Sequence, residues 1–254
     1  TFTPEMAFEI AAGFTRWIAE QTEKEPGRMK ISVGRDSRIT GPILLRAAAL
    51  GIQSTGATAV DCGLASTPAM FMSTISEGYN YDGSIIITAS HLPPNRNGMK
   101  FFTKAGGTAK TDVKQILMSA AESVQKEGPR LKTYSSPREP ETVDFMQEYA
   151  RQLRDKIKTG CNHPDTYDTP LKGFHVLVDA GNGAGGFFAT NVLVPLGADV
   201  SGSQFLEPDG MFPNHVPNPE DKKAMAMTIE AVKTQASVDL GVIFDTDVDR
   251  SAVV

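Results

Sequence analysis

The sequence lacks the features that mark several large classes of protein. Only two of its 254 residues are cysteines, Cys62 and Cys161, and neither has a cysteine or histidine neighbour at the spacing of a zinc site. No stretch approaches the roughly 20 apolar residues that a membrane-spanning helix needs. The net charge is -5, and no basic run stands out. A disulfide framework, a zinc site, a membrane anchor and a nucleic-acid partner are therefore not expected.

The beginning of the chain also lacks the apolar core of a secretory leader. Glu5, Glu9 and Arg16 lie in the first predicted helix, where a leader would carry apolar residues. We therefore expect a protein that is not secreted.

Strand and helix patterns alternate along the chain, which is typical of α/β proteins. Apolar runs predict strands at residues 30–33, 57–61, 84–88, 99–102, 174–178, near 198 and at 238–244. Periodicity predicts helices at residues 3–18, 40–51, 112–125 and 141–158, one after 178, and two more capped by Thr67 and Asn218. The polar stretch 161–170 predicts a linker between domain 1, residues 1–160, and domain 2, residues 171–254. We expect two consecutive three-layer α/β/α domains with mixed, mostly parallel sheets.

Three aspartates stand two residues apart at the end of the last predicted strand. In an extended chain Asp245, Asp247 and Asp249 face the same way, about 7 Å apart, so their carboxylates can converge on one ion. Such oxygen ligands suit Mg²⁺ or Ca²⁺. An EF-hand loop shares this spacing but follows a helix and needs glycine where Arg250 stands. A solvated acidic strand end is the simpler alternative, and three carboxylates in phase favour the metal site.

A second candidate segment, residues 88–94, follows the apolar strand at 84–88. Ser90 stands beside His91, yet adjacent residues of an extended chain point to opposite sides, and the Gly-x-Ser-x-Gly elbow of hydrolases is absent. A serine hydrolase is therefore not indicated. From spacing alone, a turn in which Ser90 caps backbone groups is an equally good interpretation.

Basic residues also stand near predicted strand ends. Arg35 and Arg38 follow the strand at 30–33, and Lys100 lies just beyond the Ser90 segment. Guanidinium donors match phosphate oxygens in pairs, so these positions favour an anionic ligand. The alternative for each side chain is an exposed surface ion pair.

Six segments, taken in order, resemble the α-D-phosphohexomutase family, which includes phosphoglucomutases, phosphomannomutases and phosphoglucosamine mutases. The resemblance spans essentially the whole chain, and it is specific because all six motifs occur in the family's order. The segments are Gly34-Arg35-Asp36-Ser37-Arg38, Thr88-Ala89-Ser90-His91, Asn97-Gly98-Met99-Lys100, Asp179-Ala180-Gly181-Asn182-Gly183, Phe212-Pro213-Asn214-His215 and Asp245 to Arg250.

The resemblance implies a Mg²⁺-dependent isomerase that moves a phosphoryl group between C1 and C6 of a hexose phosphate, its small-molecule partner. Ser90 would carry the phosphoryl group as phosphoserine, and a hexose bisphosphate would be the intermediate and activator. The basic residues would balance the charge of the acids and the phosphoserine. The implied metal ligands are Ser90, Asp245, Asp247 and Asp249, and the implied phosphate ligands are Arg35, Arg38 and Arg250.

The same resemblance implies four catalytic residues, Ser90, Lys100, His91 and Arg35. Lys100 is the candidate acceptor of the proton from the sugar hydroxyl. This role requires the site to lower its pKa from the ordinary value of about 10.4. His91 is the reserve candidate.

The sequence departs from the commonest pattern of that family at a few positions. Leu92 stands where asparagine is usual, and Thr246 and Val248 replace glycines between the aspartates. These changes stiffen or reshape both loops. The Leu92 form is similar to relatives in photosynthetic eukaryotes, so we expect the protein in the cytoplasm or in a plastid stroma.

The resemblance also implies two further domains, which supply a sugar-binding loop and a distal phosphate clamp. Neither has a matching context in this sequence. We therefore expect the chain to be the first two domains of a longer protein, with the second cut short at its C-terminal end and the fragment inactive alone. These residues specify neither the sugar nor the oligomeric state.

Two other functions fit part of the sequence. The segment from Gly181 to Gly186 contains the Gly-x-Gly-x-x-Gly pattern of NAD-binding oxidoreductases, but Ser201 and Gly202 stand where that fold needs an acid. A mutase-like protein that binds sugar phosphates or regulates a partner without catalysis is the other alternative. His215 has no expected role beyond a turn.

Overall fold

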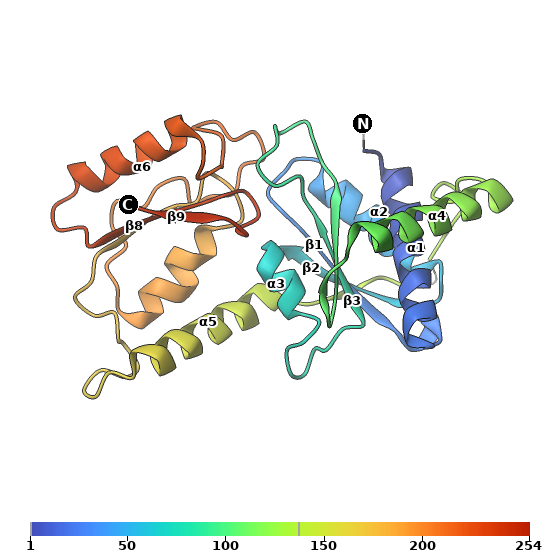
Figure 1. Ribbon diagram of the computed structural model, residues 1–254, viewed down its shortest axis with the longest axis horizontal. Helices are drawn as coiled ribbons and strands as arrows, with labels where there is room; N and C mark the ends of the chain where they lie inside the picture. The colour runs from blue at the N-terminus through green and yellow to red at the C-terminus, as the bar shows by residue number, and fades with distance from the viewer. Residues whose placement is uncertain (1, 137) are drawn as a thin grey trace. The chain divides into compact units, whose positions relative to one another are not determined.

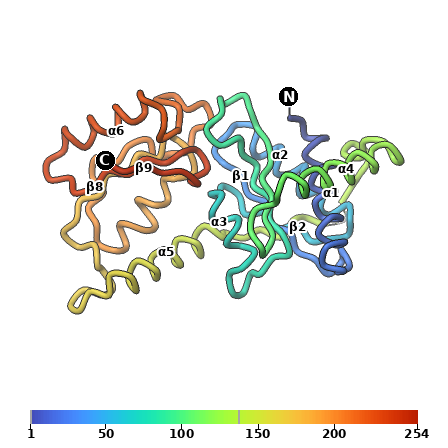
Figure 2. Tube along the Cα trace, in the orientation of Figure 1, coloured from blue at the N-terminus to red at the C-terminus, as the bar shows by residue number. Residues whose placement is uncertain are grey.

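The computed structural model describes residues 2–136 and 138–254 of the chain. They form two compact units, whose course along the sequence can be followed by colour in Figure 2. Two short loops from the first half of the sequence belong to the second unit by their contacts. Unit 1 comprises residues 2–35, Thr40–Ala89 and Asn95–Asp144, and unit 2 comprises Asp36–Ile39, Ser90–Pro94 and Phe145–Val254. Within the described residues, no helix is both long and apolar enough to cross a membrane.

Unit 1 is built on a six-stranded sheet with the strand order β5-β4-β3-β1-β2-β6 (Figure 1). Strands β3, β1, β2 and β6 run parallel, whereas β4 and β5 are antiparallel additions at one edge. The sheet is therefore mixed and mostly parallel, as predicted. The strands are β1 (Lys30–Arg35), β2 (Thr58–Leu64), β3 (Gly83–Ile87), β4 (Met99–Thr103), β5 (Gly106–Gly107) and β6 (Glu141–Thr142).

Helices cover both faces of this sheet, because successive side chains of β1 point to opposite sides. Ile31 and Val33 are fully buried in an apolar core with residues of α1, α2 and α4. On the other face, the hydroxyl oxygen of Ser32 lies 2.9 Å from that of Ser73, at the end of α3. The unit thus has three layers, helix, sheet and helix (Figure 1). The helical elements are α1 (Pro4–Thr22), η1 (Pro26–Arg28), α2 (Gly41–Gln53), α3 (Thr67–Met72) and α4 (Lys110–Glu127).

Unit 2 holds a second sheet with the order β7-β8-β9, in which β7 and β8 are parallel and β9 is antiparallel. Val178 and Phe244 pack with Leu193 on one face. On the other face, a Cβ built at Gly241 would lie 2.6 Å from the Val232 side chain of α6. Helical segments therefore cover both faces here too. The elements are α5 (Phe145–Cys161), β7 (Val176–Asp179), η2 (Phe188–Leu193), η3 (Val194–Leu196), α6 (Lys222–Thr234), β8 (Leu240–Phe244) and β9 (Ser251–Val253).

Some elements differ in extent from their predictions. The helix predicted from Glu141 begins at Phe145, because residues 141 and 142 instead pair with β2 as strand β6. The strand predicted near residue 198 is reduced to single bridges at Asp199 and Gln204. Helix α3 is capped by Ser66, one residue before the predicted cap. Helix α6 is capped by Asp221, three residues after the predicted cap.

Helix α5 belongs to unit 2 because its apolar side packs there. Ala150 is fully buried against Val192 and Leu196 of the turns that follow β7. The contacts therefore divide the chain between residues 144 and 145, whereas the sequence placed the division at the linker 161–170. An amphipathic helix does not reveal in its own sequence which neighbour it covers. The domain boundary at the linker stays a prediction.

The contact between α1 and α4 depends on a glycine. A Cβ built at Gly13 would lie 2.6 Å from the Ile116 carbonyl oxygen and 3.1 Å from the Ala120 nitrogen. Both atoms belong to the backbone of a helix, which cannot move aside as the end of a flexible side chain can. Any larger residue at this position must therefore push the two helices apart.

We expect Gly13→Ala to lower the free energy of unfolding of unit 1 by roughly 1–3 kcal/mol, although alanine is the better helix former by about 1 kcal/mol. Trp17, the only tryptophan, lies one turn further along α1, so its fluorescence during urea unfolding measures the change. Gly27→Ala is the matched control within unit 1, since nothing lies within 4 Å of a Cβ there. This control should raise stability by up to about 1 kcal/mol. A stabilising Gly13→Ala would contradict the close contact.

Candidate functional site

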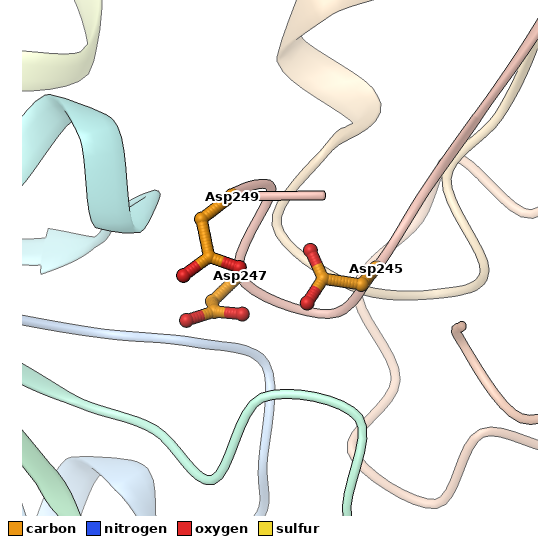
Figure 3. Close-up of side chains that lie close together, drawn as sticks. All are labelled: Asp245, Asp247 and Asp249. Carbon is orange, nitrogen blue, oxygen red and sulfur yellow. The ribbon is translucent and has the colours of Figure 1, made fainter. Parts of the chain in front are cut away.

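The three aspartates lie on the loop between β8 and β9, and this loop is a turn. The Asp245 N–H donates to the Arg250 carbonyl oxygen at 3.1 Å, and the Val248 N–H donates to the Asp245 carbonyl oxygen at 3.2 Å. The turn brings one carboxylate oxygen of each aspartate within 4.8 Å of the others (Figure 3). The predicted convergence is present, but the extended geometry assumed for it is wrong.

Burial makes this cluster of carboxylates electrostatically costly. Asp245 and Asp247 are fully buried, and Asp249 is exposed. Burial and the negative charges of Asp247 and Asp249 raise the pKa of Asp245 to about 7. A bound cation would remove this repulsion, and carboxylate oxygens are the ligands that hard divalent cations prefer. The three side chains therefore fit Mg²⁺ or a similar ion.

The glycine-rich turn after β7 packs directly against the aspartate loop. The Ala184 N–H donates to the Thr246 carbonyl oxygen at 2.8 Å, and a Cβ at Gly183 would lie 2.6 Å from the same oxygen. A Cβ at Gly185 would lie 3.0 Å from the Phe244 ring. The close packing of this turn against the aspartate loop thus accounts for its glycines. These contacts argue against the NAD-binding alternative.

Ser90 lies beside the aspartates within unit 2. Its hydroxyl donates to Asp245 Oδ2 at 3.0 Å and accepts from Arg250 Nη2 at 2.7 Å. The backbone of Ser90 has φ 52°, in the left-handed region that residues other than glycine seldom adopt. One hydroxyl is therefore held between a carboxylate and a guanidinium by a strained backbone.

His91 lies on the same side as Ser90. Its Nδ1 accepts a short hydrogen bond from Arg250 Nη2 and lies 3.5 Å from the Ser90 hydroxyl oxygen. We expected these adjacent side chains to point to opposite sides because we assumed an extended chain. Ser90 has a left-handed backbone instead, so both side chains lie on one side. Because Nδ1 accepts from Arg250, the ring proton of neutral His91 lies on Nε2.

Arg38 occupies a different environment from the one expected of a phosphate ligand. Its side chain is fully buried. Nη1 donates to Asp36, and Nη2 donates to the carbonyl oxygens of Ser90 at 2.7 Å and Leu92 at 2.6 Å. The structure thus directs these donors to protein acceptors, whereas the sequence predicted that they bind phosphate.

Arg35 and Lys100 belong to unit 1. Arg35 is the last residue of β1, where it pairs with Leu64 of β2 and Ile87 of β3. Lys100 lies in β4 opposite Ile86. Both positions lie beside the last two residues of β3. Their roles as catalytic and phosphate-binding residues stay predictions.

The sequence analysis missed a buried polar network next to the glycine-rich turn. Asp179 is fully buried and accepts from His215 Nε2 at 3.0 Å, Gln204 Nε2 at 2.8 Å, Thr228 Oγ1 at 2.9 Å and the Gly181 N–H at 2.9 Å. The His215 motif had been noticed without a role. The only sequence signal was that both motifs, Asp179 to Gly183 and Phe212 to His215, had been recognised. Their spacing along the chain could not show that Asp179 and His215 are in contact.

Residues 1–128 match the family model for phosphoglucomutase/phosphomannomutase, alpha/beta/alpha domain I, and residues 147–254 match the model for alpha/beta/alpha domain II. The chain is similar to a phosphoglucomutase of Neisseria meningitidis, with 30% identity over 258 residues that cover 100% of this chain and 50% of that protein. It is also similar to a phosphomannomutase/phosphoglucomutase of Pseudomonas aeruginosa, with 32% identity over 96% of this chain and 49% of that protein.

A solved structure shares the fold. The crystal structure of a phosphoglucomutase/phosphomannomutase family protein from Burkholderia thailandensis matches with a TM-score of 0.80 and 25% identity, and covers 100% of this chain and 51% of that one. The chain therefore spans about half the length of the relatives that it matches.

Proposed function

This chain belongs to the phosphoglucomutase/phosphomannomutase family, and from that membership we propose that the full-length protein is a phosphohexomutase. It would move a phosphoryl group between the C1 and C6 oxygens of a hexose phosphate. The observation that carries the proposal is that the Ser90 hydroxyl contacts both Asp245 and Arg250. One nucleophile thus lies next to carboxylates that fit a divalent cation and a guanidinium that matches phosphate oxygens.

In the proposed reaction Ser90 carries the phosphoryl group. The bond between phosphorus and Ser90 Oγ breaks as a sugar hydroxyl oxygen bonds to the same phosphorus, and the hydroxyl proton passes to a base. The resulting hexose bisphosphate returns its other phosphoryl group to Ser90, so the phosphoserine is restored. Lys100 is the proposed base and His91 the second candidate. A hexose bisphosphate is also the proposed activator, since it phosphorylates an unmodified Ser90.

The balance of charge supports metal-binding and phosphate-binding roles for the residues around Ser90. Asp245, Asp247 and Asp249 would hold Mg²⁺ together with the Ser90 phosphoryl group. When bound, Mg²⁺ offsets negative charge on the phosphoryl oxygens. Arg250 already contacts the hydroxyl that carries the group and is proposed to follow the phosphoryl oxygens as they move. Arg35 is proposed as a second phosphate ligand.

We expect Asp249→Asn to weaken Mg²⁺ binding to the full-length protein by at least about 10-fold, since the site loses one of three charged ligands. Asp249 is exposed, so this change should leave folding intact. Titration calorimetry with magnesium chloride measures the effect. Asp165→Asn, an exposed aspartate in the 161–170 stretch, is the matched control and should bind like the wild type. Equal Mg²⁺ affinity in wild type and Asp249→Asn would remove Asp249 from the proposed ligands.

The proposed function is tested by supplying the full-length protein with Mg²⁺, a trace of glucose 1,6-bisphosphate and glucose 1-phosphate or mannose 1-phosphate. The expected result is formation of the corresponding 6-phosphate, with mass spectrometry placing one phosphoryl group on Ser90. Glucosamine and N-acetylglucosamine phosphates complete the series, because the residues described here do not specify the sugar. Absence of both turnover and phosphoserine with all four sugars would contradict the proposal.

A further inference from the structure

Arg38 is a buried arginine whose hydrogen bonds converge on the loop that carries Ser90. Its Nη2 donates to the carbonyl oxygens of Ser90, at 2.7 Å, and of Leu92, at 2.6 Å. One nitrogen thus links the residue before His91 to the residue after it. Hydrogen bonds from a charged donor are about twice as strong as neutral ones, and a planar guanidinium holds them in a fixed direction.

The conformation that these bonds hold is one that Ser90 does not favour. A φ of 52° is adopted freely by glycine, whereas for other residues the left-handed region has an intrinsic cost, and the surrounding structure must impose it. In this conformation the Ser90 hydroxyl reaches Asp245 and Arg250. The carbonyl of Ser90 is held by Arg38, so backbone and side chain of the same residue are fixed by different partners.

Arg38 is itself held in place from several sides. Asp36 accepts from both the Arg38 side chain and, at 2.9 Å, the Arg38 N–H. The Phe212 ring lies over the guanidinium, with its centroid 5.3 Å from Cζ. A Cβ at Gly210 would lie 2.5 Å from the Ile39 nitrogen and 2.7 Å from Arg38 Cα. Segment 36–39 is therefore packed so closely against loop 210–212 that only glycine fits.

We propose that Arg38 is a positioning residue, which holds Ser90 in its left-handed conformation so that the hydroxyl meets Asp245 and Arg250. Asp36, Gly210 and Phe212 support it. The effect of this role on catalysis rests on the proposed function. We propose it in place of the predicted role of Arg38 as a phosphate ligand. A positioning residue acts on the rate of transfer, whereas a ligand of the substrate phosphate acts on substrate affinity.

The test compares three variants of the full-length protein. Arg38→Met combined with Asp36→Asn removes the ion pair without leaving a buried unpaired carboxylate. Arg38→Lys keeps the charge but not the forked geometry. Gly210→Ala displaces segment 36–39 and alters no charge. We expect kcat to fall on the order of 10²-fold in all three, with little change in the KM for the sugar phosphate.

Amide hydrogen exchange of residues 88–94, measured without substrate, gives a readout that does not depend on activity. We expect faster exchange there in the three variants. Glu9→Gln combined with Arg130→Met is the matched control, because it removes a partly buried ion pair of unit 1 and should leave this segment unchanged. Unchanged exchange, or recovery of wild-type kcat by Arg38→Lys, would overturn the positioning role. A large rise in KM with unchanged kcat would restore the role in phosphate binding.

The two proposals fail in different ways. If the wild-type protein shows neither mutase activity nor phosphoserine, the proposed function fails, and exchange of residues 88–94 still decides whether Arg38 holds the Ser90 loop. If the wild type is active and the variants keep both its kcat and its exchange pattern, the positioning role fails alone.

Discussion

Replacing Ser90 with alanine in the full-length protein should abolish interconversion of hexose 1- and 6-phosphates, a loss of at least about 10³-fold, because in the proposed reaction the Ser90 oxygen carries the phosphoryl group between the two sugar oxygens. The structure supports this expectation through the two hydrogen bonds of the Ser90 hydroxyl, to Asp245 and Arg250. The variant should also incorporate no phosphoryl group from glucose 1,6-bisphosphate. A coupled assay for the 6-phosphate and mass spectrometry of the intact protein measure the two effects.

Ser37→Ala is the matched control for this experiment. Ser37 is a buried serine of unit 2, and among the described residues its hydroxyl has no hydrogen-bond partner. Its removal should leave activity and phosphoserine content unchanged. Full mutase activity in Ser90→Ala would place the phosphoryl carrier elsewhere. Loss of activity in both variants would point to damage of the loops rather than loss of a nucleophile.

The parts of the site that lie within short segments were predictable from the sequence. Asp245, Asp247 and Asp249 are recognisable by spacing, although the turn that joins them was not, because Val248 adopts a φ of 66° that β-branched residues rarely adopt. Spacing alone could not predict that Ser90 contacts Asp245, because the two residues are 155 positions apart in the sequence. That contact followed only from the order of six motifs and their resemblance to a family.

The contacts of Arg38 with the carbonyl oxygens of Ser90 and Leu92 could not be predicted from the sequence, and the reason is physical. A guanidinium offers the same donors to a phosphate as to backbone carbonyls, and the carbonyls that it meets lie 52 and 54 positions away. The fold shows the same limit. The parallel order of the strands in unit 1 followed from alternation of strands and helices, whereas the side to which α5 packs depended on the distant residues Val192 and Leu196.

The buried pair of Asp179 and His215 should contribute strongly to the stability of unit 2. The His215 ring faces an acceptor at each nitrogen, since Nε2 contacts the Asp179 carboxylate and Nδ1 lies 2.9 Å from the Val216 carbonyl oxygen. Only an imidazolium can donate to both. Burial lowers the pKa of His215, but its hydrogen bonds to Asp179 and Val216 and the charges of Asp179 and Asp221 together raise it above 6.5.

The raised pKa of His215 makes this residue one source of pH dependence in the stability of the fold. Below about pH 6.5 the imidazole is protonated in both folded and unfolded chains, and the pair contributes in full. As the pH rises from that value to the folded pKa, the unfolded chain releases the proton and the folded chain keeps it. The free energy of unfolding then falls with a slope that approaches about 1.4 kcal/mol per pH unit. Above the folded pKa this contribution is lost.

We therefore expect His215→Gln to lower the free energy of unfolding at pH 6 by roughly 1.5–3 kcal/mol and to remove that pH-dependent loss. Asp179→Asn should cost more, on the order of 3–5 kcal/mol, because it leaves an imidazolium buried without its carboxylate and turns an amide donor toward other donors. Urea unfolding from pH 5.5 to 8.5, followed by circular dichroism, measures both effects. His163→Gln, which removes an exposed imidazole, should keep the wild-type slope. A wild-type slope in His215→Gln would mean that His215 is buried neutral, and that the network is held by hydrogen bonds without the charge.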